Sequence, residues 1–448
     1  MTEPPEIATE PPEIRSARRR YVTVCALFWL PPGLAMAPLV LLFTERGMAL
    51  TAIAGFYAVH SLTVAALELP TGGLSDAIGR RPVLALAGVL NTGALVIHAL
   101  GSTAWALTLG MVLMGAGRAL ASGPAEAWYV DSVQACSGPG ADLRTGLARG
   151  SAATSAALAA GILLGGALPW LLGTGPDLGA RITEATGGVV LPLSVPVLLG
   201  AAVQIAFVCY VLAALREPPR PPVTARSVLR GIPGTVLSGV RLGGRDALVR
   251  RVLLTTAAAG SALAAIELLM PGRAVTLTGA SASGAMLFAG LACGGFVCAG
   301  LGSHLAPLLA RRTGSGERAV LAGLGVSTLG LLLLGVTAAF TRPASIAMVG
   351  LGFALVYAGF GAAGPNENAL LHRRVTGEGR ATALSVQSLA QQSVGALTGV
   401  IVGAMSPGPW PWLLVTGVLL AGTLLWLGRG GGGLPGMPEP VEAGERVP

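Results

Sequence analysis

The feature that most constrains this chain is a series of long apolar runs, each bounded by short polar segments. Each run has roughly 20 residues, the length that a helix needs to cross a bilayer. Only 11% of the 448 residues are charged, whereas soluble globular proteins carry about 25%. The sequence therefore predicts an all-α integral membrane protein with 12 transmembrane helices. We expect these helices at about 21–43, 50–73, 83–101, 104–127, 150–172, 188–214, 252–271, 281–309, 319–340, 344–368, 380–405 and 409–427.

The basic residues orient the helices in the membrane. All 29 are arginines, and all but Arg118 lie in the polar segments outside the apolar runs or at the end of a run, rather than in one patch. This scatter argues against a nucleic-acid partner. With the N-terminus inside, 24 of them fall on the cytoplasmic side and four on the outer side. Because cytoplasmic loops of membrane proteins carry an excess of Lys and Arg, we expect both termini in the cytoplasm and the protein in the plasma membrane.

The two halves of the chain share a short repeat. The sequence G-P-x-E occurs at the inner end of the fourth run and again at the inner end of the tenth. Transporters are often built from repeated halves, so we expect two pseudo-symmetric six-helix bundles around a central cavity. The two copies are Gly123-Pro124-Ala125-Glu126 and Gly364-Pro365-Asn366-Glu367.

The longest polar segment divides the runs into six and six, and it sets the expected domain boundaries. These are a cytoplasmic N-terminal tail (1–20), an N-terminal six-helix bundle (21–214), a central cytoplasmic loop (215–251), a C-terminal six-helix bundle (252–428) and a disordered cytoplasmic tail (429–448).

The segment between the second and third runs carries the most specific motif in the chain. It reads Gly73-Leu74-Ser75-Asp76-Ala77-Ile78-Gly79-Arg80-Arg81-Pro82. This segment resembles the signature loop of the major facilitator superfamily, G-x-L-x-D-x-x-G-R-R/K. The neighbouring segments 68–72 and 122–131 are similar to those of drug-efflux members of that family. The resemblance covers the chain from Tyr21 to Leu427 and implies a secondary transporter with that family's fold.

The resemblance also implies a conformational latch in this loop. Asp76 would face the start of the eleventh helix near 380–383, where the helix dipole favours a negative charge. Arg80 would pair with Asp131 at the end of the fourth helix. Such a network would hold the two halves together in the outward-facing state; the alternative is that Arg80 and Arg81 only orient the helices. The full set of latch residues is Gly73, Asp76, Gly79, Arg80, Arg81 and Asp131.

Charged side chains inside the apolar runs are candidates for substrate binding or proton coupling, because a charge at the bilayer centre costs roughly 3 kcal/mol or more. Arg118 lies near mid-depth in the fourth run. It would bind an anionic group or tune a nearby carboxylate, or else be satisfied by backbone carbonyls. Glu267 lies in the outer half of the seventh run. It would exchange a proton for a cationic substrate, or else contact Arg273 or water at the outer interface. His60, near the middle of the second run, would transfer protons or form a helix–helix hydrogen bond.

Three glutamates near the inner ends of the runs form a second group. Glu126 and Glu367 occupy the same position in the two G-P-x-E motifs, and Glu68 precedes the signature loop. We expect all three to act as an inner gate, held by charge networks, rather than as direct substrate contacts. The arginines expected in these networks are Arg80 and either Arg311 or Arg312.

These features favour a secondary active transporter that works by alternating access and exports a small apolar or cationic compound in exchange for protons. The alternative is an ion-coupled transporter of a specific metabolite, such as a sugar, an amino acid or an organic anion. The sequence contains no phosphate-binding loop, metal-ligand spacing or nucleophile motif, so we expect no enzyme activity, metal or cofactor. The expected partners are a small-molecule substrate, protons and the lipid bilayer, and the expected oligomeric state is a monomer.

Overall fold

The computed structural model of the chain describes residues 11–138, 141–217, 244, 246–340, 344–374 and 379–427. Within these ranges every regular element is a helix, which confirms the expected fold class. Parts of the expected tails and most of the central loop lie outside the described residues. The helices are α1 (Pro12–Met36), α2 (Leu39–Glu45), α3 (Leu50–Ile78), α4 (Arg80–Leu100), α5 (Ala104–Ala121), α6 (Pro124–Ser137), α7 (Arg144–Leu172), α8 (Leu178–Ala185), α9 (Ser194–Ala214), α11 (Ala247–Thr278), α12 (Ser281–Thr313), α13 (Gly316–Thr337), α14 (Ala344–Arg374), α15 (Gly379–Ala404) and α16 (Pro409–Leu424).

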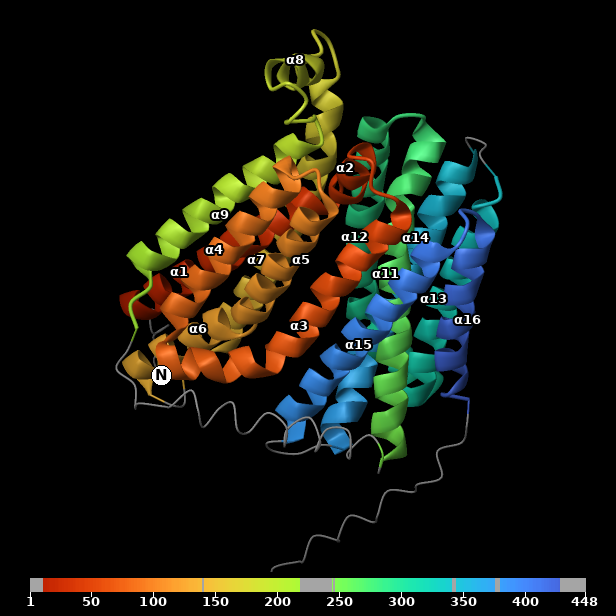
Figure 1. Ribbon diagram of the computed structural model, residues 1–448. Helices are drawn as coiled ribbons and strands as arrows, with labels where there is room; N and C mark the ends of the chain where they lie inside the picture. Colours follow the sequence, from red (N-terminus) through yellow and green to blue (C-terminus); the bar gives the residue numbers. More distant parts are fainter. Residues whose placement is uncertain are drawn as a thin grey trace, which may run out of the picture.

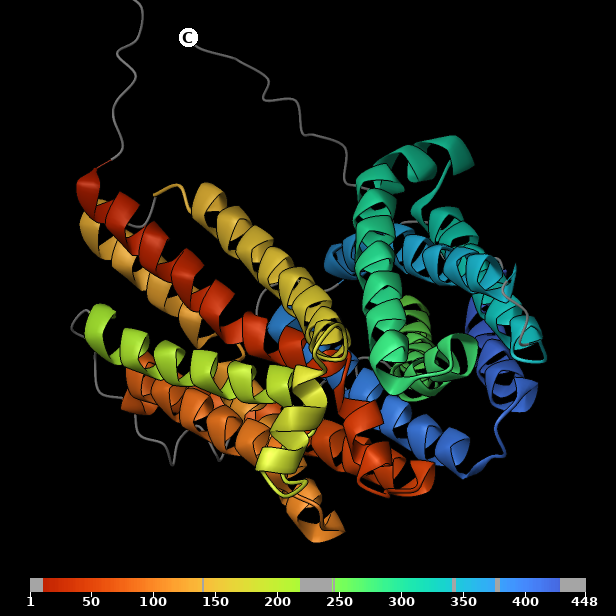
Figure 2. The same ribbon diagram turned by 90° about the horizontal axis from the view of Figure 1, so that it is seen from above.

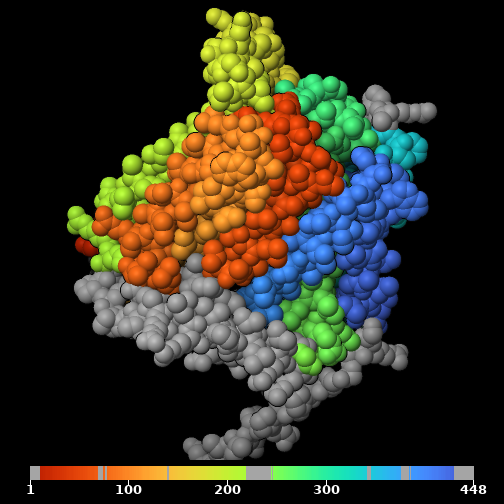
Figure 3. Space-filling view, in the orientation of Figure 1, coloured from red at the N-terminus to blue at the C-terminus, as the bar shows by residue number. Residues whose placement is uncertain are grey.

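The helices account for the expected membrane crossings. Nine spans in the described ranges are long and apolar enough to cross a bilayer, one of them made of α5 and α6 together. The pair α1 and α2, bent by 42°, forms a tenth. Helix α15, with 26 residues, and the shorter apolar helix α16, with 16, lie where the sequence predicts the other two crossings. The short helix α8 crosses nothing and projects beyond the other helices (Figures 1 and 3).

The helices form two groups in chain order. Helices α1 to α9 gather on one side of the molecule and α11 to α16 on the other (Figures 1 and 2). The groups meet where α3 packs against α15 and where α7 packs against α12; Figure 3 shows α15 lying along α3 on the surface. Helix α1 begins and α16 ends at the same end of the molecule (Figure 1). We call this the termini end, and the opposite end the far end.

At the far end the two groups are in close contact through small residues. A Cβ atom added at Gly166 of α7 would collide with Ala285 and Ala289 of α12. A Cβ atom added at Gly403 of α15 would collide with Ala54 of α3. Small residues let membrane helices approach closely. The far end is therefore closed by backbone contact, and a cavity between the groups has no opening at these two seams.

The two G-P-x-E motifs differ in backbone conformation. Gly123 has a φ of 95°, which separates α5 from α6, and Pro124 then occupies the first turn of α6. A positive φ is accessible to glycine at little cost, and proline is favoured at a helix start. In contrast, Gly364 and Pro365 lie inside the continuous helix α14. The sequence repeat therefore produces a helix break in the first half and an unbroken helix in the second.

Helix α14 continues through Pro365 because a side chain compensates for the missing backbone donor. A proline inside a helix leaves the carbonyl four residues earlier without its N–H partner. For Pro365 this is the carbonyl of Gly361, and the Ser303 hydroxyl of α12 donates a hydrogen bond to it at 3.0 Å. Neighbouring helix α12 thus supplies the bond that α14 cannot make by itself.

Candidate functional site

A cavity of about 480 Å³ lies between the two helix groups. We call it the central cavity. Its walls combine aromatic rings with a small number of polar side chains, the composition expected of a small-molecule site. From the first group the main lining residues are Phe28, Trp29, Tyr57, His60, Asn91 and Arg118; from the second group they are Glu267, Phe288, Phe296, Gln391 and Gln392.

Arg118 faces the central cavity from α5. Its side chain is exposed there, and its guanidinium carbon lies 5.3 Å from the centre of the Trp29 ring. A guanidinium at this distance is attracted by the ring's negative face. Arg118 comes fourteen residues after the start of α5, which places it about 21 Å along the helix axis from the far end. Arg118 therefore belongs to the cavity wall near mid-depth.

Glu267 faces the same cavity from α11. The seventh span does not end near Pro271, as the sequence suggested, but continues to Thr278. Glu267 is therefore well inside the helix. Arg273, its expected contact at the outer interface, instead donates hydrogen bonds to the carbonyl oxygens of Thr337 and Phe340. Among the described residues, none forms an ion pair with the Glu267 carboxylate.

The structure places His60 and Glu68 on one helix but in different settings. His60 is half-buried and lines the central cavity. Glu68 lies eight residues further along α3, about 12 Å closer to the termini end. Its carboxylate accepts a hydrogen bond of 2.7 Å from the Ser388 hydroxyl of α15. This bond joins the two helix groups below the central cavity.

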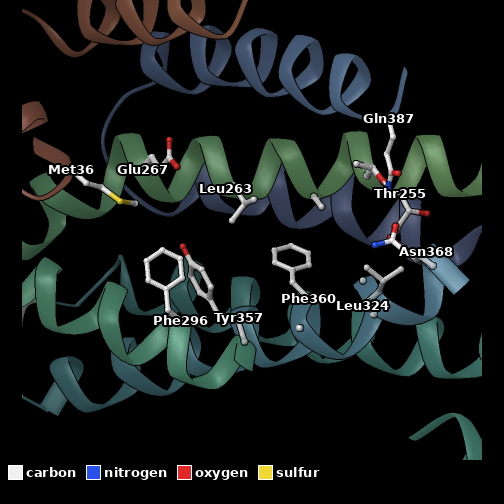
Figure 4. A pocket seen from close by; sticks show the side chains of 17 residues that line it. Met36, Thr255, Leu263, Glu267, Phe296, Leu324, Tyr357, Phe360, Asn368 and Gln387 are labelled. Atoms are coloured by element: carbon white, nitrogen blue, oxygen red, sulfur yellow. Dashed lines mark hydrogen bonds between the residues drawn. The ribbon is translucent and has the colours of Figure 1, made fainter. Parts of the chain in front are cut away.

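A second cavity, of about 440 Å³, lies within the second helix group. We call it the side cavity. Figure 4 shows Glu267 and Met36 at one end of it, and Thr255, Asn368 and Gln387 towards the other. Its opposite wall carries aromatic rings, and Glu367 also lines it. The two cavities share Met36, Leu263, Glu267 and Phe296.

The expected inner gate is not assembled as a single network. Glu367 is only 7% exposed and forms no ion pair with any described residue. Arg311 and Arg312, its expected partners, are exposed in the last turn of α12. The physical reason is orientation: α14 turns Glu367 into the side cavity, whereas the end of α12 presents its arginines outward. Glu126 is exposed in the first turn of α6.

The signature loop forms a very tight connection. A single residue, Gly79 with a φ of 102°, separates α3 from α4. The Arg80 guanidinium lies 2.9 Å from the Asp131 carboxylate, with side chains 11% and 29% exposed. The side chain of Asp76 and residues 69–73, including Gly73, lie in α3, but their side-chain placement is outside the described part of the structure. The same holds for the side chain of Arg380.

Two sets of residues around these features were missed from the sequence. Glu217, directly after the sixth span, accepts a hydrogen bond from the backbone N–H of Arg81, while the Arg81 guanidinium donates to the carbonyl of Leu212. The available signal in the sequence was that Glu217 is acidic and lies on the same expected side of the membrane as Arg80 and Arg81. The second set is the amide face of α15, where Gln387 and Gln391 repeat at a four-residue spacing inside an apolar run.

Several solved structures of membrane transporters resemble this chain. The nucleoside transporter NupG aligns with a TM-score of 0.70 at 12% identity, over 92% of this chain and 98% of that one. A bacterial homolog of the human lysosomal transporter Spinster, in an inward-facing and occupied conformation, aligns with a TM-score of 0.69 at 15% identity, over 93% and 97%. A D-xylose–proton symporter aligns with a TM-score of 0.67 at 16% identity, over 92% and 97%. These identities establish a shared fold.

No curated protein matches the chain. The family model described as Major Facilitator Superfamily matches residues 23–399, which include the signature loop, both cavities and all but the last of the membrane-crossing helices. The match covers most of the chain and agrees with the resemblance of the signature loop. The protein is therefore a multi-pass membrane transporter that belongs to the Major Facilitator Superfamily.

Proposed function

We propose that this transporter exports a small apolar or cationic compound in exchange for protons, with Glu267 as the coupling carboxylate. The observation that supports this most directly is the position of Glu267. It lines both cavities and has no ion-pair partner among the described residues. A carboxylate removed from water and left unpaired is stabilised by binding either a proton or a cation, and that exchange is the chemical basis of proton antiport.

The lining of the central cavity suits the proposed substrate. Rings of Phe28, Trp29, Tyr57, Phe288 and Phe296 surround the volume. Aromatic faces bind apolar groups and attract cations. A cationic substrate would place its charge at the carboxylate and its apolar body against these rings. The small number of polar groups would then limit the cost of moving the compound through the protein.

Arg118 gives the coupling step its dependence on conformation. It approaches Glu267 from the opposite helix group, so a rocking movement of the groups changes the distance between the two charges. When they are close, the guanidinium competes with a proton or a substrate for the carboxylate. When the two charges are apart, the carboxylate of Glu267 binds either the proton or the substrate. Arg118 and Glu267 thus act together although no ion pair joins them in this state.

Alternating access would proceed by relative movement of the two bundles, 21–214 and 252–428, joined by the loop 215–251. The contacts of Gly166 and Gly403 at the closed far end are the ones that such a movement breaks, whereas the hydrogen bond between Ser388 and Glu68 lies on the other side of the cavity. In the other state the signature loop would act as the latch, and the Arg80–Asp131 pair, which is already formed within the first helix group, would hold the loop in position. In this orientation the termini end faces the cytoplasm and the far end faces the outside of the plasma membrane.

The test is accumulation of a fluorescent lipophilic cation in efflux-deficient cells that express the protein, with and without an uncoupler. We expect wild-type cells to accumulate less dye and the uncoupler to remove the difference. Glu267→Gln should accumulate dye to the level of empty cells at equal surface expression. Glu184→Gln is the matched control, because Glu184 is an exposed carboxylate on α8 outside both cavities. Export that persists in Glu267→Gln would exclude Glu267 from coupling.

One observation favours the alternative, an ion-coupled transporter of a specific metabolite. Arg118 is exposed in the central cavity, where the amide groups of Asn91, Gln391 and Gln392 also lie. A guanidinium and several amides can bind an anionic or highly polar compound. The solved neighbours include transporters of a nucleoside and of D-xylose. Saturable uptake of one polar metabolite, lost in Arg118→Gln and without any effect on dye accumulation, would favour this function.

A further inference from the structure

Glu367 is a buried acidic side chain to which the described residues supply no ion-pair partner. It is 7% exposed, and its Oε1 has no hydrogen-bond partner in the described part of the chain. A bare carboxylate in such a place is costly, and binding of a proton or a cation removes that cost. Its counterpart Glu126 is exposed in the first turn of α6, where the helix dipole stabilises a negative charge. The break at Gly123 creates that helix start. Helix α14 is unbroken, so no helix start lies beside Glu367.

The side cavity connects Glu367 with Glu267. Both carboxylates line it, and they lie at different depths. Along α11, Glu267 follows Thr256 by eleven residues, or about 16 Å; along α14, Glu367 follows Tyr357 by ten residues, or about 15 Å. Figure 4 shows the same arrangement, with Tyr357 near Glu267 and with Thr255 near Asn368 at the other end. Both helices therefore give a separation of about 15 Å between Glu267 and Glu367 along the side cavity.

The end of the side cavity near Glu367 can hold water. Thr255, Thr256, Asn368 and Gln387 line it there, and the Gln387 amide donates a hydrogen bond of 2.9 Å to the Thr256 hydroxyl. A buried site retains water when it is roomy and offers two or more polar partners. These side chains meet that condition beside Glu367.

No charged side chain of the described residues forms an ion pair with Glu367. On α11 and α13, Arg251 lies 3.9 Å from Glu317 at the termini end, and Arg250 and Arg318 are exposed. On its own helix, His372 follows one turn later and Nδ1 of its ring is buried without a hydrogen bond. The titratable side chains of α12 at this end are exposed; they are His304, Arg311 and Arg312.

We propose that Glu367 is a second proton-binding site, which passes protons between Glu267 and the termini end through the side cavity. This inference rests on the proposed role of Glu267. A cationic substrate that binds Glu267 displaces its proton, which moves through water in the side cavity to Oε1 of Glu367. From there the proton leaves on a water molecule as hydronium, and Glu367 is ready to accept the next one. Protons and substrate thus follow separate routes from the same carboxylate.

The first experiment detects the proton on Glu367 directly, with no substrate present. The purified full-length protein is reconstituted in liposomes, and its carboxylic acid C=O stretch is recorded by infrared difference spectroscopy as the pH is changed. We expect a protonated carboxylic acid at neutral pH whose signal is lost in Glu367→Gln. The signal should remain in Glu126→Gln, because that side chain is exposed and lies outside both cavities.

Two results would overturn the proposal. In the first, the spectra of wild type and Glu367→Gln coincide, so that Glu367 holds no proton. In the second, sodium chloride removes the signal at constant pH, so that Glu367 binds a metal cation in place of a proton. Thermal unfolding of Glu367→Gln at the wild-type temperature establishes that the variant is folded, and the amide is nearly isosteric with the acid.

The second experiment tests the route. Tetraphenylphosphonium is added to the detergent-solubilised protein, and proton release is followed with a pH-sensitive dye. We expect slower release in Glu367→Gln and in Gly364→Leu, whose side chain would fill the open space at Gly364 on the cavity wall. Binding of tetraphenylphosphonium should be unchanged, and Gly364→Ala should release protons at the wild-type rate.

The outcomes separate this inference from the proposed function. Release at the wild-type rate in both Glu367→Gln and Gly364→Leu would refute the route. Absence of proton release from the wild type on cation binding would refute the proposed coupling at Glu267, and the infrared signal of Glu367 would still decide whether Glu367 binds a proton.

Discussion

Substitution of the two repeat glycines by alanine should have opposite effects on stability. Gly123 has a φ of 95°, whereas Gly364 has helical geometry inside α14. At both positions an added Cβ would meet no atom within 4 Å. A steric clash therefore contributes nothing at either site, and the two substitutions differ only in the backbone conformation that they require.

The magnitude follows from that difference. An L-residue forced into a left-handed conformation costs about 1–2 kcal/mol, so Gly123→Ala should destabilise the protein by about that amount. In a helix interior, alanine is more stable than glycine by roughly 0.5–1 kcal/mol, so Gly364→Ala should stabilise the protein. The two variants should differ by about 2 kcal/mol in the free energy of unfolding.

The assay is unfolding of the detergent-solubilised protein by added sodium dodecyl sulfate, followed with a thiol-reactive fluorescent dye. Cys25, Cys293 and Cys298 are only partly exposed in the folded protein and become reactive as it unfolds. We expect the midpoints to fall in the order Gly123→Ala, wild type, Gly364→Ala. Equal midpoints for the two variants would refute the reasoning, because they would mean that α5 and α6 can form one continuous helix at no cost.

Three further predictions concern the contacts between the halves and the cavity wall. Gly166→Leu should open the far end, because α12 leaves no room for a side chain there. In a protein otherwise free of cysteine, an impermeant thiol reagent added outside should then modify a cysteine placed at Ser61 in the central cavity. An unreactive cysteine would contradict this prediction. Ser388→Ala should loosen the contact between α3 and α15 below the central cavity, because it removes a hydrogen bond to the Glu68 carboxylate, worth about 1.5–3 kcal/mol. The same cysteine should then react faster with a thiol reagent that enters from the termini end, and an unchanged rate would show that this bond does not restrict access. Trp29→Leu should make the Arg118 guanidinium more mobile and weaken binding of an anionic ligand only slightly, since a cation–π contact is worth roughly 0.5–2 kcal/mol. Titration calorimetry with matched anionic and neutral ligands measures the loss of affinity for the anionic one.

The latch loop shows how far sequence reasoning could go. The motif indicated a pair between Arg80 and Asp131, and the structure places the two side chains 2.9 Å apart. The resemblance to the family motif supplied this pairing, because Arg80 and Asp131 lie on different helices, α4 and α6, and the local sequence of the loop does not bring them together. Glu217 was not found, because it comes from a distant helix end that only folding brings to the loop.

The two glutamates of the repeat show where sequence reasoning fails. Glu126 and Glu367 have identical positions in matching motifs, and the sequence predicted one role for both. The structure exposes the first on a helix start and buries the second in the side cavity. The difference arises at Ser303, whose hydroxyl replaces the hydrogen bond that a proline removes from α14. That partner belongs to another helix and cannot be read from the motif.

The sequence by itself determined the class of fold, the number of crossings and the family. The reason is that a bilayer selects strongly for apolar runs of sufficient length, and such runs can be recognised in the sequence alone. Only the tertiary structure decided which charged residues share a cavity, because that depends on the rotation of each helix about its axis and on its neighbours. Arg118 and Glu267 lie 149 positions apart in the sequence and come to face one cavity through packing of small residues at the seams between the two halves.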